Sequence, residues 1–175
     1  MKRNITLAFI VLFSFILQTT VFASLSLGNV CPNLLIICTA AYGFMFGRRY
    51  GMVTGFICGL LMDVFYGSTL GFYALVYLYI GFGNGYFHRI FYQEDIKLPL
   101  ALISTSDLLY SLVTYILLFL LRGRFDFFTY VRELIIPEII YTIFVAVFLY
   151  PVILFLNRTK DPSEKRGERK FAKKD

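Results

Sequence analysis

The chain has 175 residues and a net charge of +6, and 58% of its residues are hydrophobic while only 16% are charged. Soluble proteins contain roughly 45–50% apolar and about 25% charged residues, and a soluble core of this size could not bury so much apolar surface. With a mean hydropathy of +0.71, the composition excludes a soluble globular domain and predicts an integral membrane protein.

Apolar segments in chain order predict an all-α bundle of about six transmembrane helices. A membrane helix needs about 20 mostly apolar residues. The expected spans cover residues 5–23, 30–46, 52–66, 70–87, 98–121 and 134–156. Val21-Phe22-Ala23 before Ser24 resembles a signal-peptide cleavage site, but the apolar stretch is longer than the usual 7–15 residues, so we expect a retained helix. The third and fourth segments are rich in glycine, and a re-entrant hairpin is the alternative to two full crossings.

Lys and Arg residues predict the orientation. With the N-terminus inside, the cytoplasmic segments hold fourteen of the 17 basic residues, and the outer segments hold Arg122, Arg124 and Arg132. This asymmetry favours two cytoplasmic termini. Residues 157–175 form a basic segment of low apolar content, which we expect to be disordered and attracted to anionic lipid.

A row of glycines distinguishes the third segment. Gly51, Gly55 and Gly59 recur every four residues, and Asp63 follows at the same interval. Because this spacing is close to one helical turn, the glycines should form a groove that another helix can approach closely. Asp63 should lie at the outer end of this groove, either as a turn or cap residue bonded to the backbone of residues 67–69 or in a functional role.

The fifth segment carries an intramembrane polar face. Ser104, Asp107, Ser111 and Thr114 recur at intervals of three and four, which places them on one side of a helix. Ionisable groups inside a membrane normally face protein or water because insertion into lipid is costly. Asp107 could be neutralised by internal hydrogen bonds, or the face could contact a partner protein or a small molecule.

The predicted outer loop mixes basic and aromatic residues, a composition typical of a membrane interface. It could anchor the chain at the interface or dock an extracytoplasmic partner. Glu138 follows Pro137 at a helix start, where the helix dipole favours an acid. The candidate contact residues are Arg122, Arg124, Phe127, Phe128, Arg132 and Glu138.

The sequence lacks the motifs of catalytic and cofactor sites. It contains no P-loop, no H-E-x-x-H, no G-x-S-x-G and no His/Cys set with metal-ligand spacing. The basic residues have no accompanying nucleic-acid-binding motif. We therefore expect a non-enzymatic protein without cofactor, metal or nucleic-acid partner, which contacts the lipid bilayer and other proteins.

Several motifs resemble the MreD family of bacterial rod shape-determining membrane proteins. They are Pro32-Asn33-Leu34-Leu35-Ile36-Ile37, the run from Gly51 to Gly59 that leads into Leu60-Leu61-Met62-Asp63-Val64-Phe65, and Gly67 with Leu70-Gly71. Length, a charged N-terminus and a basic tail are also similar, while the last two spans match only in general character.

The resemblance implies a non-enzymatic component of the lateral cell-wall elongation complex in the bacterial inner membrane. The implied partners are an MreC-like single-span protein, a RodA-type glycan polymerase, a class B penicillin-binding protein and the MreB cytoskeleton. The family is also similar in fold to the substrate-binding components of energy-coupling-factor transporters. The alternative function is therefore a vitamin-type uptake subunit whose pocket Asp107 and its polar neighbours would line. A lipid-precursor flippase would need intramembrane Arg or Lys, which the predicted spans lack.

Overall fold

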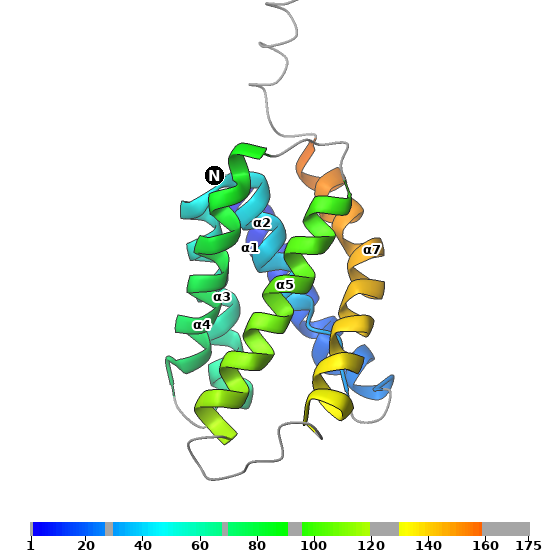
Figure 1. Ribbon diagram of the computed structural model, residues 1–175. Coiled ribbons are helices and arrows are strands. Elements are labelled where there is room, and N and C mark those ends of the chain that lie inside the picture. Colours follow the sequence, from blue (N-terminus) through cyan, green and yellow to red (C-terminus); the bar gives the residue numbers. More distant parts are fainter. Residues whose placement is uncertain (1, 27–29, 68–69, 91–95, 120–129, 159–175) are drawn as a thin grey trace, which may run out of the picture.

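The computed structural model describes residues 2–26, 30–67, 70–90, 96–119 and 130–158. Six α-helices make up most of these ranges, and four of them are flanked by short π or 3-10 turns (Figure 1). The elements are α1 (Lys2–Leu17) with η1 (Gln18–Phe22), α2 (Leu34–Phe46), α3 (Arg48–Tyr66), α4 (Phe72–Tyr86) with η2 (Phe87–Ile90), α5 (Lys97–Thr114) with η3 (Tyr115–Phe119), and η5 (Val131–Ile135) with α7 (Ile136–Arg158).

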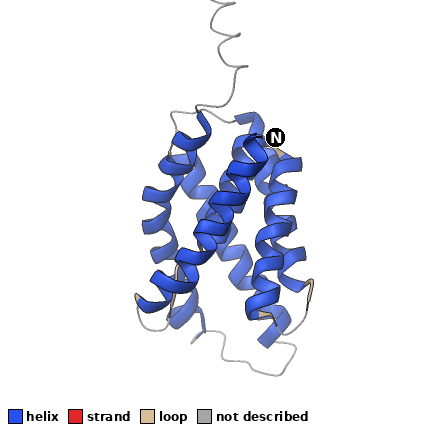
Figure 2. Ribbon diagram, turned by 180° about the vertical axis from the view of Figure 1, so that it is seen from behind, coloured by secondary structure: helices blue, strands red, loops and turns tan. Residues whose placement is uncertain are grey.

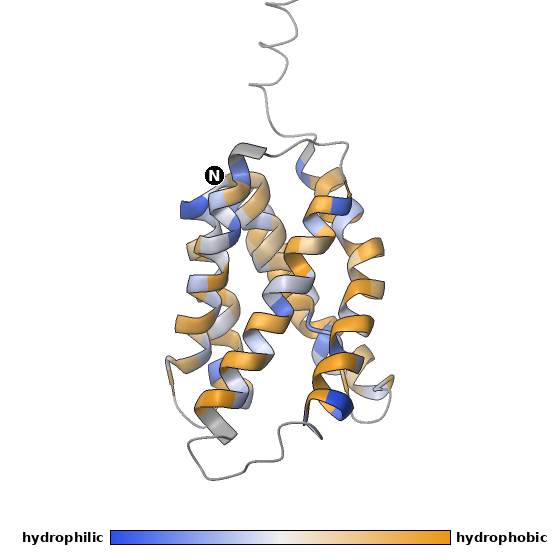
Figure 3. Ribbon diagram, viewed as in Figure 1, coloured by the Kyte–Doolittle hydropathy of each residue, from blue (hydrophilic) through white to orange (hydrophobic). Residues whose placement is uncertain are grey.

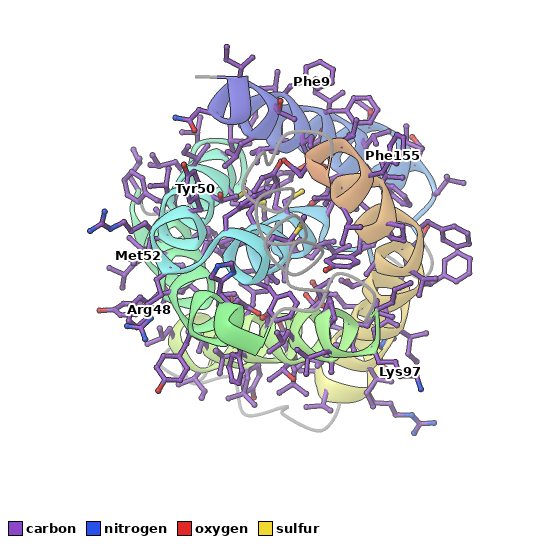
Figure 4. All side chains as sticks on the ribbon, turned by 90° about the horizontal axis from the view of Figure 1, so that it is seen from above. Phe9, Arg48, Tyr50, Met52, Lys97 and Phe155 are labelled. Atoms are coloured by element: carbon purple, nitrogen blue, oxygen red, sulfur yellow. The ribbon has the colours of Figure 1, made fainter. Side chains whose placement is uncertain are left out.

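Helix α2 forms the centre of the bundle. All of its residues except Phe46 are buried, as expected for a helix that is apolar on every side. It contacts each of the other five α-helices, and the view from above shows it enclosed by them (Figure 4). Asn33 sets its start, because the side-chain oxygen accepts hydrogen bonds from the Ile36 N–H at 3.3 Å and from the Tyr77 hydroxyl at 2.9 Å. The helix therefore begins at Leu34, four residues later than the expected span.

The remaining helices surround α2. Helices α3 and α4 lie together on one side and α7 on the other, α5 runs obliquely across the front between them, and α1 runs diagonally across the back from the N-terminus (Figures 1 and 2). A single residue, Gly47, joins α2 to α3, and its φ of +86° lies in the left-handed region that favours glycine. Because the turn is so short, Arg48 and Arg49 are exposed in the first turn of α3, and this helix begins four residues before the expected span.

The outer surface is largely apolar, and hydrophobic colour predominates along the outer helices (Figure 3). Phe9 is 68% exposed, Phe155 is 72% exposed, and both project away from the bundle (Figure 4). Soluble monomers rarely expose contiguous apolar patches of this kind. An all-α membrane protein accounts for this surface.

Three helices in the described ranges are long and apolar enough to cross a membrane, and they cover Asn4–Phe22, Lys97–Leu117 and Val131–Asn157. Helix α2 has 13 residues and is about 20 Å long, whereas a hydrocarbon core is about 30 Å thick. Length and composition thus support three of the six expected crossings.

Candidate functional site

The glycine row of α3 lies against α4. Helices α3 and α4 make the most extensive helix–helix contact in the described part of the chain. A Cβ atom on Gly51 would collide with the Gly81 carbonyl oxygen, and one on Gly55 would collide with the Tyr77 carbonyl oxygen. A Cβ on Gly59 would meet the backbone of Ala74. The two backbones are therefore in direct contact along three helical turns, and no side chain larger than hydrogen fits on α3 at these positions.

Asp63 lies at the end of this glycine row and caps the neighbouring helix. Its carboxylate accepts hydrogen bonds from the backbone N–H groups of Gly71 at 3.0 Å, Tyr73 at 2.9 Å and Ala74 at 2.9 Å. The first N–H groups of a helix lack intrahelical partners, and Gly71, the residue before α4, has no side chain to supply one. Asp63 supplies this cap from α3. Its partners lie further along the chain than the expected residues 67–69.

The polar face of α5 is only partly directed into the bundle. Asp107, Ser111 and Thr114 are buried, with 0%, 2% and 8% of their surface exposed. Ser104 is half-buried, and its hydroxyl donates to the Leu100 carbonyl of its own helix at 2.8 Å. Three of the four predicted residues thus lie in the interior between α5 and its neighbours.

Asp107 has polar surroundings but no hydrogen bond of normal geometry. Both carboxylate oxygens are buried without a partner among the described residues. The Thr142 hydroxyl of α7 lies beside this carboxyl, and the same hydroxyl oxygen accepts the Asn33 N–H at 3.1 Å. That internal hydrogen bonds neutralise Asp107 stays a prediction, and the Thr142 hydroxyl is the neighbouring group that could donate one.

Glu138 joins the same region from the first turn of α7. The Ser111 hydroxyl donates to Glu138 Oε2 at 3.1 Å, so the glutamate bonds to α5 as well as lying at a helix start. Ser111 lies one turn after Asp107 on α5. The carboxyls of Asp107 and Glu138 interact electrostatically. Asp107, Ser111 and Glu138, with Thr114 and Thr142 on the same helices, are called the α5–α7 polar cluster below.

The other predicted contact residues are placed only in part. Arg122, Arg124, Phe127 and Phe128 lie outside the described residues. Arg132 is exposed in η5, before the start of α7.

A second buried polar contact, between α4 and α5, is absent from the sequence-based predictions. The Asn84 amide donates to the Ser106 hydroxyl at 2.7 Å and to the Ile80 carbonyl at 2.9 Å. The one signal for Asn84 is a polar residue between two glycines in an otherwise apolar helix. Ser106 falls outside the predicted face because it lies one residue before Asp107, about 100° around the helix.

Replacement of Asp107 tests what its site requires. In sodium-free buffer we expect Asp107→Asn to retain membrane abundance and to lower the free energy of unfolding by about 1 kcal/mol or less, because asparagine matches aspartic acid in size and keeps a polar group beside Thr142. Leucine is larger, the site is fully buried, and overpacking costs about 1–3 kcal/mol. Thermal unfolding in detergent measures both variants. An equal loss of unfolding free energy in Asp107→Asn and Asp107→Leu would show that the negative charge itself is required.

Comparison with known families identifies the chain. Residues 2–160 match the family described as rod shape-determining protein MreD. The chain belongs to the MreD family. MreD proteins act in determining rod cell shape, so this is the chain's general role, and the family is one of shape-determining membrane proteins without an assigned enzymatic activity. Neither a curated protein nor a solved structure matches this MreD chain.

Proposed function

We propose that this MreD protein is a non-enzymatic scaffold of the lateral cell-wall elongation complex. It binds an MreC-like single-span protein, a RodA-type glycan polymerase and a class B penicillin-binding protein, and through this assembly it is connected to MreB. The protein lies in the inner membrane as six crossings with both termini in the cytoplasm. The family match over residues 2–160 carries this proposal.

The bundle supports a scaffold role because its interior and its outer surface differ in character. Helix α2 and the α3–α4 backbone contact form a closely packed interior, which favours a rigid body. The outer faces of α1 and α7 carry exposed aromatic residues, including Phe9 and Phe144. An apolar groove of about 580 Å³ lies along α7 between Ile136 and Phe144. Partner helices can pack on such faces inside the membrane without burying polar groups.

Site-specific cross-linking tests this function. A photo-reactive amino acid is placed at Phe9 or Phe144 in a tagged full-length chain, illuminated in native membranes, and the products are purified and identified by mass spectrometry. We expect both exposed positions to capture an MreC-like protein or one of the two synthases. The matched control is Tyr42, which is fully buried in α2 and should capture no partner.

A different set of captured proteins would overturn the scaffold proposal. Recovery of a cytoplasmic ATPase together with a coupling membrane protein would instead favour the uptake-subunit function, with the fold of an energy-coupling-factor component. The unpaired Asp107 carboxyl is the observation that favours this second candidate, because a ligand could supply its missing partner. Recovery of neither set from either exposed position would contradict both functions.

A further inference from the structure

Two carboxylates from different helices flank one serine inside the bundle. Asp107 lies one helical turn before Ser111 on α5, and Glu138 of α7 accepts the Ser111 hydroxyl at 3.1 Å. Asp107 interacts electrostatically with Glu138, and it also lies beside Thr142, one turn further along α7. The two antiparallel helices thus bring both acids and three hydroxyl-bearing residues into the α5–α7 polar cluster.

In the part of the chain that the structure describes, the titratable groups that face these carboxyls include no base. They are Tyr77 from α4, Tyr110 from α5, Tyr130 from the segment before η5, and Cys31 from the segment before α2. In the described ranges, no Lys, Arg or His interacts with Asp107 or Glu138. Among the described residues, these two adjacent acids in a membrane interior therefore have no counter-charge, and an isolated buried carboxylate is strongly disfavoured.

Unpaired oxygens in the same cluster provide an independent indication. Both oxygens of Asp107 are buried without a hydrogen-bond partner among the described residues, and so is the Thr114 hydroxyl oxygen. Thr114 follows Ser111 by three residues and lies on the same side of α5. Buried polar atoms in native proteins normally have partners, so unpaired carboxylate oxygens beside a second acid favour a site that binds positive charge.

We propose that the α5–α7 polar cluster is an intramembrane binding site for a monovalent cation. Its ligands are the carboxylates of Asp107 and Glu138 and the hydroxyls of Ser111 and Thr142. These are hard oxygen donors, which suit either a proton shared between the acids or a sodium ion. The proposal concerns this chain alone and does not depend on the identity of its partner proteins.

Thermal unfolding of the purified full-length protein in detergent distinguishes the two cations. The chain has no Trp, so loss of helical circular dichroism is the readout. In one arm, choline chloride in the buffer is replaced by sodium chloride at constant ionic strength. The same replacement is repeated with potassium chloride. The other arm raises the pH in choline alone.

Each cation gives its own expected result. A sodium site predicts a midpoint that rises by roughly 5–10 °C at saturating sodium and not with choline. A proton site binds more protons in the folded than in the unfolded state, so stability is present at low pH and lost as the pH rises, by roughly 3–5 °C per pH unit through the transition. Asp107→Asn and Glu138→Gln should each remove the cation dependence, whichever cation causes it.

A matched control variant separates this site from other acids. Glu133→Gln removes an exposed acid next to the start of α7 and should leave the cation dependence unchanged. The dependence of the wild-type unfolding midpoint on sodium and pH tests the site even if one of the two cluster variants fails to fold. A wild-type midpoint that responds to neither sodium nor pH would overturn the proposal, and so would a response that persists in both Asp107→Asn and Glu138→Gln.

Discussion

Replacing Gly55 with leucine is expected to separate α3 from α4 and to deplete the protein from the membrane. A side chain at this position meets the Tyr77 backbone, which cannot move aside as a flexible side chain can. Overpacking usually costs about 1–3 kcal/mol, and a clash with backbone in the most extensive helix contact should cost about 3 kcal/mol or more. Thermal unfolding of the purified protein should show a midpoint lower by roughly 6–12 °C.

The same substitution at Gly83 is the matched control. Gly83 lies on α4, only two residues from Gly81, but a Cβ atom there has no heavy atom within 4 Å. Gly83→Leu should therefore retain near wild-type abundance and a midpoint within a few degrees of it. In cells that depend on this gene for rod shape, Gly55→Leu should give rounded cells and Gly83→Leu rods. A Gly55→Leu protein with the wild-type midpoint would show that the backbone contact is not needed for stability.

The sequence predicts features that depend on one helix alone. Gly51, Gly55 and Gly59 are spaced by four residues, and the geometry of a single helix places them on one face. The glycine groove was therefore predictable. The facing residues on α4 were not, because helix pairing depends on how the chain turns between the two. For the same reason the partners of Asp63 lie eight to eleven residues ahead of it, beyond the turn.

Hydroxyl groups show a second limit of periodicity. A serine in a helix can always donate to the carbonyl four residues earlier, as Ser104 does. Ser106, two residues after Ser104 on α5, makes the same kind of bond to the Leu102 carbonyl. Its hydroxyl also accepts a hydrogen bond from the Asn84 amide of α4. The spacing of polar residues therefore identified the interior side of α5 near Asp107 but could not determine which serine has a partner on another helix.

Helix ends were the least predictable part of the fold because they depend on backbone conformation. Hydropathy excludes arginine from a span, yet Arg48 and Arg49 are helical because Gly47 completes the turn in one residue. Pro32 permits an earlier start for α2, but the Asn33 side chain bonds to the backbone and fixes the start at Leu34. Each of these ends is set by a local conformation or a capping bond that an average over a window of residues does not detect.

Replacing Asp63 with leucine is expected to loosen the start of α4. The change leaves the N–H groups of Gly71, Tyr73 and Ala74 without their acceptor at a position that is only 2% exposed. Loss of a helix cap costs about 0.5–2 kcal/mol, and each buried unpaired donor costs about 1–3 kcal/mol, so a total loss of about 3 kcal/mol or more is expected. Asp63→Asn keeps one carbonyl oxygen as an acceptor and should give an intermediate loss.

Hydrogen exchange distinguishes this capping role from a general loss of packing. Mass spectrometry of peptides covering residues 70–78 should show faster exchange in Asp63→Leu than in wild type at a temperature where the rest of the protein stays protected. Glu133→Leu, at an exposed acid outside the α3–α4 pair, should change stability by no more than about 0.5 kcal/mol. If Asp63→Leu had wild-type protection in this peptide, the glycine contact alone would hold α4 in place and the carboxylate would be free for a different role.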